Sequence, residues 1–255
     1  MIPRKKKWVV LFGGAGREGC VERMISEGVQ VELIILPAVS NAKLDAAISK
    51  LRRLPCKLVN IKRAELEHTL LRHVGLSLIS IGFPYLISDK ILSQFHLALN
   101  IHPTLLPKYR GPTSAANILI NNESESGSTI HHMTAYMDRG DIVAQNSVPI
   151  TAFDTVRSLQ RKVYASEPQL LMDAFLNIEK GLMARPQDEK NASEFPKKRT
   201  PADSQLDPKQ SLSELFDKIR ACDSESFPAF FMHKGQKVCI KLWRPEKSEI
   251  EADEI

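Results

Sequence analysis

Three polar residues of this sequence have the side-chain types needed to move a proton and to stabilise negative charge. Asn100 and His102 stand two positions apart at the end of an apolar run, and Asp138 lies in the polar turn 135–141. An amide can donate a hydrogen bond to a developing oxyanion, an imidazole can move a proton, and a carboxylate can orient the imidazole and favour its charged form. Together these groups meet the needs of acyl transfer without a covalent enzyme intermediate.

Asn100 and His102 leave the predicted strand 98–101 on the same face, because side chains along a strand alternate with period two. Open α/β sheets bind ligands in a crevice beyond the carboxyl ends of their strands, so we expect the amide and the imidazole to share such a cleft. A second interpretation of His102 stays open, namely a strand-end histidine whose ring is satisfied by backbone groups.

The first half of the chain alternates short apolar runs with amphipathic stretches, which indicates a parallel sheet covered on both faces. The predicted strands are 8–12, 29–36, 57–61, 76–82 and 98–101, and the predicted helices are 21–27, 64–74 and 89–95. Two later strand-like runs, 128–133 and 142–150, are joined only by the polar turn and predict an antiparallel addition.

The second half begins with a long apolar-periodic stretch, 156–183, in which Pro168 is expected to break or kink the helix. A polar segment, 184–196, follows as a predicted linker, and then come a helix at 212–222 and two strands within 227–243. We therefore expect an α/β fold with a doubly wound, Rossmann-like, mostly parallel sheet. The expected domains are a catalytic domain, 1–190, and a small helix and β-hairpin subdomain, 191–255.

Composition narrows the class of protein. The formal net charge of +5 is compatible with a phosphorylated substrate or with nucleic acid and does not separate the two. The four cysteines are widely spaced and form no CxxC pair, which favours reduced thiols and a cytoplasmic location. No apolar run reaches the roughly 20 residues of a bilayer span, so we expect neither a membrane partner nor a signal peptide.

A glycine motif, GxGxxG at residues 14–19, follows the first predicted strand. A dinucleotide site also needs an acidic residue roughly 20 positions later, at the end of the second strand. That strand ends instead in Pro37-Ala38-Val39-Ser40, so the sequence does not favour NAD or NADP. A tight turn without a ligand, or an anion site at a helix N-terminus, remains open.

Other kinds of chemistry find little support. There is no GxSxG nucleophile motif. His131 and His132 are adjacent, would point to opposite faces of a strand and have no nearby cysteine, so we predict no metal site.

The stretches NIHPTLLPKYRG, GSTIHHM and MDRGDIVAQ, which begin at residues 100, 127 and 137, resemble the folate-dependent formyltransferase family. The resemblance extends over about residues 76–150 and implies that Asn100, His102 and Asp138 form the catalytic trio. It also implies a 10-formyltetrahydrofolate donor whose pterin lies against residues 82–88 and the turn 135–138. The implied donor contacts are Phe83, Tyr85, Leu86, Ile87, Tyr136 and Asp138, with backbone groups of Tyr85 and Ile87 facing the pterin.

The acceptor amine differs among the branches of that family, which act on glycinamide ribonucleotide, methionyl-tRNA or sugar nucleotides. The stretches KKRTPADSQLD and DKIRACDSESFPAFF resemble the sugar-nucleotide branch, although a glycine expected before Ala229 and a tryptophan expected in GPTSAANIL are absent. Only some 55 residues follow Thr200, too few for the tRNA enzyme's barrel, and the ribonucleotide enzyme ends earlier. The expected acceptor is an amino-dideoxyhexose linked to dTDP, GDP or UDP, used for O-antigen or another surface polysaccharide.

By the same resemblance, Gly14 and Arg17 are candidates for binding the acceptor's phosphates, and Tyr109 and Arg110 are further acceptor-pocket candidates. In the expected mechanism the amine attacks the formyl carbon, Asn100 and protonated His102 stabilise the oxyanion, and Asp138 holds His102. We expect a homodimer paired through the C-terminal segment and no nucleic acid partner. The alternatives are the other two acceptors and a folate-binding or scaffold protein without activity.

Overall fold

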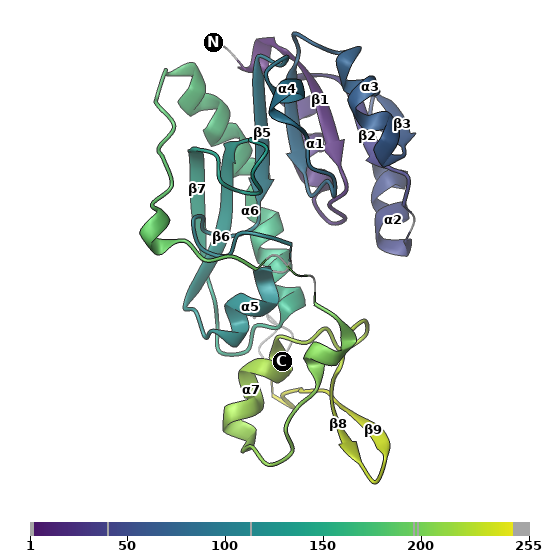
Figure 1. Cartoon of the computed structure of the whole chain (residues 1–255), viewed down its shortest axis with the longest axis vertical. Helices are drawn as coiled ribbons and strands as arrows, with labels where there is room; N and C mark the ends of the chain where they lie inside the picture. Colours follow the sequence, from purple (N-terminus) through teal and green to yellow (C-terminus); the bar gives the residue numbers. More distant parts are fainter. Residues whose placement is uncertain (1–2, 40, 113, 196, 198, 247–255) are drawn as a thin grey trace.

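The sheet at the centre of the molecule has seven strands in the order β3-β2-β1-β4-β5-β6-β7. The computed structural model describes residues 3–39, 41–112, 114–195, 197 and 199–246. The strands are β1 (Lys7–Phe12), β2 (Gln30–Pro37), β3 (Lys57–Ile61), β4 (Ser77–Ile81), β5 (Leu97–His102), β6 (Glu125–His132) and β7 (Ile142–Pro149). The first five in chain order pair in parallel, and β6 and β7 add in antiparallel fashion. The predicted doubly wound sheet with an antiparallel addition is confirmed (Figure 1).

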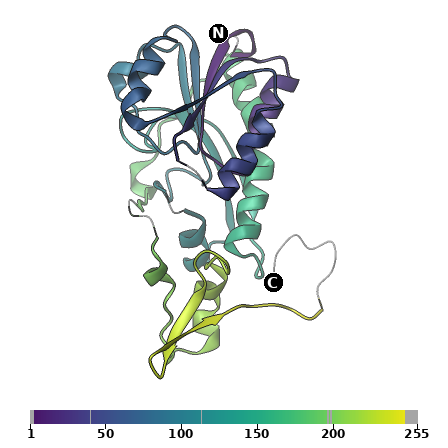
Figure 2. The ribbon, with the colours of Figure 1, turned by 90° about the vertical axis from the view of Figure 1, so that its right-hand side faces the viewer.

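Helices cover this sheet, and a small hairpin lies at the far end of the molecule from the N-terminus (Figures 1 and 2). The helices are α1 (Glu18–Ser26), α2 (Ala42–Leu51), α3 (Leu66–Leu71), α4 (Asp89–Leu92), α5 (Ser114–Ile120), α6 (Val156–Glu179) and α7 (Leu212–Arg220). The hairpin consists of β8 (Ala229–His233) and β9 (Gln236–Ile240), joined by a turn at Lys234-Gly235. None of the helices in the described ranges is long and apolar enough to cross a membrane.

The alternation of side chains along β1 explains why the sheet needs helices on both faces. Trp8, Val10 and Phe12 pack into one apolar cluster with residues of α1, α2 and α6. Val9 and Leu11 pack into a second cluster with residues of α3 and α4. Because every residue from Trp8 to Phe12 is buried, neither face of this central strand could be left to water.

The glycine motif after β1 is required by the packing of two loops against each other. Gly13 and Gly14 both donate their N–H groups to Ile81 O, at 3.1 and 3.0 Å. Gly82, in the loop after β4, has a φ of +65°, and a Cβ placed on it would lie 2.8 Å from the Gly14 Cα. The backbones of the two loops therefore meet where the strand order reverses between β1 and β4, which is where such sheets open a ligand crevice.

Pro168 does not break its helix, which leaves the kink as the other outcome that the sequence prediction allowed. Helix α6 extends without interruption from Val156 to Glu179. Pro168 faces Gly19 of α1, where a Cβ on the glycine would lie 3.4 Å from the proline Cγ. Packing between the two helices, and the buried ion pair formed by the preceding residue, offset the loss of one helical hydrogen bond.

That ion pair joins Arg17, at the start of α1, to Glu167 of α6. Nε and Nη2 of Arg17 donate to the two carboxylate oxygens at 2.6 and 2.7 Å, and Ser128 Oγ donates to the same carboxylate at 2.8 Å. Arg17 Nη2 also donates to Ile101 O, between Asn100 and His102, at 3.0 Å. Both charged side chains are buried, so each depends on the other for its charge to be tolerated.

The segment predicted as a linker, 184–196, is a strap over its described part, 184–195, where it bridges to β7 and to Arg110. Arg185 forms a bridge with Ile142 of β7, and Glu194 forms one with Arg110. In Figure 1 the chain after α6 returns beside β7 toward the opposite end of the sheet. A free linker was predicted because the segment is polar, but its polar side chains bind the catalytic domain.

The C-terminal residues have an apolar cluster of their own, and charged side chains tie it to α6 and its preceding loop. Its buried members are Leu206, Leu215, Ile219, Cys222 and Ala229. Arg220 Nη1 donates to Thr151 O and Asp154 O, and Arg157 of α6 forms a two-bond ion pair with Asp223. The predicted helix and hairpin are present, and the division at residue 190 stays a prediction.

We expect Glu167→Leu to lower the free energy of unfolding by about 3–5 kcal/mol, because it leaves the Arg17 cation buried without a partner. The double variant Arg17→Met/Glu167→Leu should recover much of that loss. Urea unfolding followed by circular dichroism measures both. Glu32→Gln breaks the exposed Lys7–Glu32 pair and serves as the control, with a change of about 1 kcal/mol or less. Equal losses for Glu167→Leu and Glu32→Gln would contradict the expectation.

Candidate active site

A cavity of about 910 Å³ opens beyond the carboxyl ends of β1, β4 and β5. The loop after β1 and the loop after β4 form one wall of the cavity. The floor of the cavity is formed by the end of β5, with Asn100, Ile101 and His102. Residues of α5, α6 and the C-terminal subdomain complete it. The cavity therefore lies in the crevice that the sequence predicted, and Asn100 and His102 share it.

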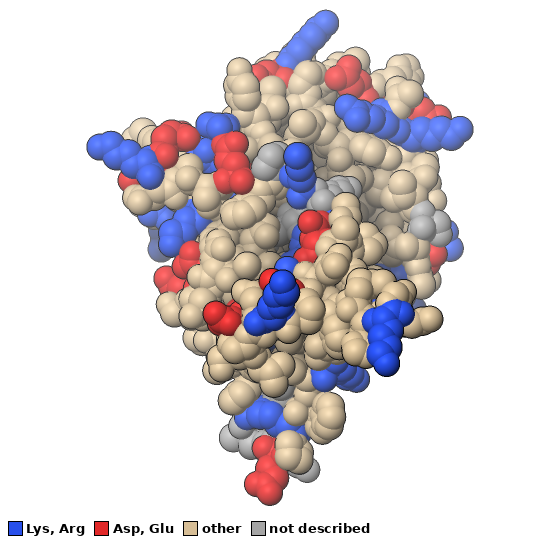
Figure 3. Space-filling model, turned by 60° about the horizontal axis from the view of Figure 1, so that its bottom comes forward, with Lys and Arg blue, Asp and Glu red and all other residues tan. Residues whose placement is uncertain are grey.

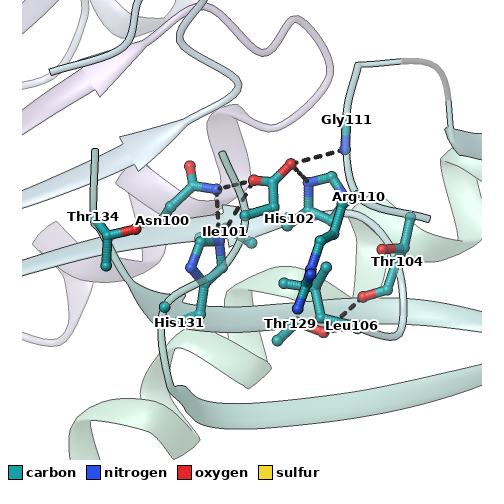
Figure 4. A network of polar contacts seen from close by, with 12 residues as sticks. Asn100, Ile101, His102, Thr104, Leu106, Arg110, Gly111, Thr129, His131 and Thr134 are labelled. Atoms are coloured by element: carbon teal, nitrogen blue, oxygen red, sulfur yellow. Dashed lines mark hydrogen bonds and ion pairs between the residues drawn. The ribbon is translucent and has the colours of Figure 1, made fainter. Parts of the chain in front are cut away.

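Two histidines and an amide meet at the floor of the cavity. Asn100 and His102 lie on β5, and His131 lies directly opposite Asn100 on the antiparallel strand β6. Asn100 Nδ2 is 3.0 Å from His131 Nε2. The three side chains point toward a common space between them (Figure 4).

The Asp138 carboxylate occupies the centre of this group. One oxygen lies 3.4 Å from His102 Nδ1 and accepts a hydrogen bond from Gly111 N at 2.9 Å. The other lies 3.5 Å from Asn100 Nδ2 and 3.6 Å from His131 Nε2. Asp138 has a φ of 55°, a left-handed conformation that a non-glycine residue adopts only when its surroundings hold it.

Burial and neighbouring charge set the protonation of this site. Burial alone would raise the pKa of Asp138, but His102, His131 and the Gly111 N–H hold that pKa well below its ordinary value. Burial lowers the pKa of His102 below 6.5, against the opposing effects of Asp138 and of the Tyr109 carbonyl. The site therefore holds an ionised carboxylate beside a neutral His102 at neutral pH, and the protonated His102 of the expected mechanism has to form during the reaction.

The hydrogen-bond partners of the two rings indicate where each carries its proton. His102 Nε2 is 2.9 Å from Tyr109 O, which can only accept, so this nitrogen carries the proton and Nδ1 is left basic. His131 Nδ1 is 2.8 Å from His132 O, so its Nε2 can accept from the Asn100 amide. From the sequence, His131 was considered only as a metal ligand, and its place in this group was not predicted. Its pairing opposite Asn100 in the two predicted strands is the signal that would have found it.

Gln187 of the strap holds the backbone of the Asp138 turn. Its Nε2 donates to Asp138 O and to Gly140 O, both at 2.8 Å, and its Oε1 accepts from Arg110 Nε and Nη2 at 3.1 and 2.8 Å. Every hydrogen-bonding group of this amide is used. Sequence alone gave no sign of its role, because the 184–196 segment read as a linker.

Arg110 and Arg139 pin the same strap through two of its carboxylates. Arg110 Nη2 donates to Glu189 at 2.7 Å, and Arg139 Nη1 reaches Glu189 at 3.2 Å. Arg139 also pairs with Glu194. Because Arg110 precedes Gly111 and Arg139 follows Asp138, the network connects the strap to both sides of the Asp138–Gly111 hydrogen bond.

The predicted donor contacts divide into two groups. Phe83, Tyr85, Leu86 and Tyr136 line the cavity together with Asp138, and the ring of Phe83 meets that of Tyr85 edge to face. Leu86 and Tyr136 are exposed there, at 56% and 71%. Ile87 instead packs into the apolar cluster with α3 and α4, which leaves only its backbone for a ligand.

The predicted acceptor contacts are largely occupied by other residues. Gly14 and Arg17 line the cavity, but Glu167 neutralises the Arg17 guanidinium. Tyr109 and Arg110 are buried and do not belong to the cavity lining. Tyr109 Oη donates to Glu123, and burial raises the pKa of Tyr109 to about 12. The structure thus favours structural roles for Arg17, Tyr109 and Arg110.

Within the described residues no group of three or more His, Cys, Asp and Glu side chains could hold a metal ion. His131 and His132 project to opposite sides of β6, since only His131 reaches the cavity.

Comparison with known families identifies a formyl transferase domain over residues 57–175. This range includes β5 with Asn100 and His102, β6 with His131, and the Asp138 turn. The resemblance to formyltransferases noted in the sequence is confirmed, and the match supports a formyl-transferring enzyme.

Solved structures of sugar N-formyltransferases share the fold of this chain along nearly its whole length. One from a Shewanella species has 20% identity and a TM-score of 0.74, covering 95% of this chain and 98% of that one. A 4-N formyltransferase from Francisella tularensis has 21% identity and a TM-score of 0.76, covering 94% and 98%. An N-formyltransferase from Helicobacter canadensis, in complex with folinic acid and dTDP-3-aminofucose, has 20% identity and a TM-score of 0.70, covering 91% and 86%. At these identities the likeness establishes the fold.

We expect Asp138→Asn to lower the pKa of His102 further, because it removes the charge that opposes the effect of burial. In the wild-type protein His102 should titrate below 6.5, and in the variant its midpoint should fall again. NMR titration of labelled imidazoles measures both. His132 is the internal control, because burial lowers its pKa as well but the carboxylate near it is Asp141. Its titration midpoint should be the same in the wild-type protein and in the variant. A rise in the His102 midpoint would refute the proposed pairing.

Gln187→Met should reduce kcat by about tenfold to a hundredfold and leave both KM values nearly unchanged, because it frees the Asp138 turn without touching the cavity. Steady-state kinetics measure the split between kcat and KM. The matched control is Gln169→Met on the exposed face of α6, where Gln169 bonds only Asp173. A rise in KM at constant kcat would indicate that Gln187 serves binding and not positioning.

Proposed function

We propose that this protein is a sugar-nucleotide N-formyltransferase that transfers a formyl group from 10-formyltetrahydrofolate to the amino group of a nucleotide-linked amino-dideoxyhexose. The observation that carries the proposal is the ionised Asp138 held beside a neutral His102 and Asn100 in one cavity. These groups belong to a formyl transferase domain, and their types suit proton transfer and oxyanion stabilisation. Asn100, His102 and Asp138 are the proposed catalytic residues.

The residues at one end of the cavity suit the flat ring of a folate. Leu86, Tyr136 and Met137 are apolar or aromatic side chains that stand exposed beside the catalytic group, where a bound ring could cover them. Phe83 and Tyr85 line the same end. When bound, 10-formyltetrahydrofolate supplies the formyl group. No metal is needed for the proposed reaction, because His102 can move the proton.

His102 is proposed to act as the base. Its Nδ1 accepts the proton that the acceptor amine loses as the amine bonds to the formyl carbon, and the imidazolium that results is stabilised by Asp138 Oδ2 at 3.4 Å. The bond between the formyl carbon and the folate nitrogen N10 then breaks, and His102 returns the proton to N10, which releases tetrahydrofolate and restores the neutral ring. Tyr109 O holds the opposite nitrogen and keeps the ring from turning. The neutral ring of the resting protein is therefore the form that the reaction requires.

Asn100 is proposed to stabilise the negative charge that develops on the formyl oxygen. One hydrogen of its Nδ2 is held by His131 at 3.0 Å, and the other meets Asp138 only at 3.5 Å. That second hydrogen is available to an oxyanion, while His131 fixes the orientation of the amide. His131 is thus a positioning residue for Asn100.

The class of acceptor is inferred from the extent of the cavity and from the ligand bound to a relative. The cavity continues past the catalytic group to the C-terminal subdomain, which supplies space for a ligand larger than a small amine. The Helicobacter canadensis relative was solved with dTDP-3-aminofucose, which suits a nucleotide-linked amino sugar here. On the face that Figure 3 shows, Lys and Arg side chains are interspersed with Asp and Glu and form no continuous basic patch of the kind that would attract a methionyl-tRNA acceptor. Glycinamide ribonucleotide stays the second acceptor to test.

Other features of the proposal extend from this activity. A cytoplasmic enzyme would meet both folate and nucleotide sugars, and O-antigen or another surface polysaccharide is the proposed destination of the product. The proposed homodimer would pair through the C-terminal subdomain, where Phe227, Met232 and Trp243 are exposed large apolar side chains. A folate-binding protein without activity would keep the cavity but would not need an ionised Asp138 beside a basic nitrogen.

We expect Asn100→Ala and His102→Ala each to lower the rate of formyl transfer by about a hundredfold or more, because each removes a group that acts on the transition state. Release of tetrahydrofolate, followed by absorbance, measures the rate with dTDP-, GDP- and UDP-linked amino sugars, glycinamide ribonucleotide and charged tRNA.

Gln169→Met, on the exposed face of α6 and outside the cavity, is the control and should retain most of the activity. Release with the ribonucleotide alone would move the assignment to that acceptor. No release with any amine, together with tight folate binding, would favour the inactive folate-binding protein.

A further inference from the structure

The cavity has a second end, away from the aromatic side chains of the folate end, that the proposed chemistry leaves unassigned. Helices α5 and α6 and the C-terminal subdomain meet there. Most of its lining is apolar, from Ala115, Ala116, Val156, Leu159, Val163, Ala221 and Phe227. Its polar members are Gln160, Tyr164, Arg199, Cys222, Asp223 and Ser226. A charged group of a ligand that reaches this end would therefore meet few charged side chains of the protein.

Arg199 is the one cation of the described cavity lining that is not paired with a carboxylate. The only other arginine there, Arg17, is neutralised by Glu167 at 2.6 Å. The one carboxylate in the described lining at this end is Asp223. Its two oxygens accept hydrogen bonds from Nε and Nη2 of Arg157. Hydrogen bonds from Thr200 and, after them, the charge of Arg199 lower the pKa of Asp203, but no ion pair joins Arg199 to that carboxylate, so its charge can still act on a ligand.

The contacts of Arg199 leave most of its donors unused. All of them involve Nη2, which lies 3.3 Å from Asp203 O, 3.5 Å from Ser204 Oγ and 3.7 Å from Cys222 Sγ. These are long bonds to neutral acceptors. Neither Nε nor Nη1 donates to another described residue, although the side chain is half-buried. The N–H groups on Nε and Nη1 are therefore available to the oxygens of a phosphate, and the long bonds of Nη2 could be exchanged for a shorter one to the same anion.

The turn around Arg199 does not need the arginine for its own stability. Asp203 accepts from Thr200 N at 2.6 Å and from Thr200 Oγ1 at 2.9 Å, which closes the turn 200–204. Ser204 Oγ donates to Phe227 O and connects the turn to the strand region that follows. Since these bonds are made by other side chains, Arg199 has no evident structural task that accounts for a half-buried charge.

We propose that Arg199 binds the diphosphate of the acceptor, and that this end of the cavity is the site for a nucleoside diphosphate. The inference rests on the proposed sugar-nucleotide activity and replaces Arg17 as the residue that meets the phosphates. The sugar then extends from Arg199 toward His102, which places its amine at the basic nitrogen. The apolar wall of α5 and α6 is left for the sugar ring and the nucleoside.

Calorimetric titration of the full chain with dTDP, GDP and UDP, each compared with its own nucleoside, tests the proposal. Arg199→Gln should weaken the binding of the preferred diphosphate by about tenfold to a hundredfold, since a charge-assisted hydrogen bond pair is lost. Nucleoside binding should stay the same. Arg199→Lys keeps the charge without the fork and should lie between the wild-type protein and Arg199→Gln.

Two controls separate a local effect from a general one. Lys209→Gln removes one positive charge from the same subdomain at an exposed position outside the cavity, and it should leave diphosphate binding unchanged. Binding of 5-formyltetrahydrofolate, a stable analogue of the donor, should be the same in all variants. The apparent melting temperature without ligand shows whether Arg199→Gln is folded.

The outcomes distinguish this inference from the proposed function. If the wild-type protein formylates a nucleotide sugar but Arg199→Gln binds the diphosphate normally, the inference is wrong and the function stands. Equal losses for the diphosphate and its nucleoside would show that Arg199 shapes the cavity and does not bind phosphate, which also overturns the inference. If no nucleoside diphosphate binds and no nucleotide sugar is formylated, both the inference and the proposed function fail.

Discussion

The Asp138 carboxylate is the constraint around which the candidate active site is built. A buried, ionised carboxylate is tolerated only when several donors or positive charges face it. Here the Gly111 N–H donates to it at 2.9 Å and the Asn100 amide lies 3.5 Å away, while His102 and His131 face it from two different strands and can take up a positive charge beside it. Because the backbone of Asp138 is left-handed, the position also needs support from outside the turn, which Gln187 gives through the Asp138 carbonyl. A segment almost fifty residues later in the chain is thus part of the catalytic geometry.

Buried arginines follow one physical rule in this protein. Arg17 and Arg110 are each almost fully buried, and each donates to glutamate side chains. A guanidinium without water must be paired, since the penalty for an isolated buried charge exceeds that of losing a typical hydrogen bond. Arg17 joins α1 to Glu167 of α6 and also donates to the carbonyl of Ile101, which lies between Asn100 and His102. Arg110 donates to Glu189 of the strap. Both arginines therefore support the site from behind.

Local patterns in the sequence predicted the parts of the fold that depend on local periodicity. The strands of the parallel sheet, the antiparallel pair and the C-terminal hairpin were found because apolar runs and turn residues mark them directly. Helix α2 was missed although Leu44, Ala47, Ile48 and Leu51 have helical spacing and Asn41 caps it. Of the break or kink expected at Pro168, the break does not occur, because packing against α1 outweighs the cost of one hydrogen bond.

The candidate site shows the same division between local and distant information. Asn100 and His102 could be placed together because two residues of one strand share a face by period alone. The roles of Arg17 and Gln187 could not be read, because each depends on a partner that is distant in sequence, Glu167 or the Asp138 turn. Glycines 13, 14 and 82 form a backbone contact between two loops, and a sequence motif for phosphate binding looks the same as a motif for that contact.

The separation of charges along the cavity follows from the task of His102. A phosphate bound beside this ring would favour its protonated form and would raise its pKa, so the ring could no longer accept a proton from the amine. The Arg17 cation acts in the opposite direction and lowers the pKa of His102, although Glu167 compensates its charge. A site for the diphosphate on the C-terminal subdomain keeps the negative charge of the acceptor on a different element from His102. With the sugar lying between them, the diphosphate stays at a distance from His102. The protein can then bind an anion and still keep His102 neutral before it accepts the proton of the amine.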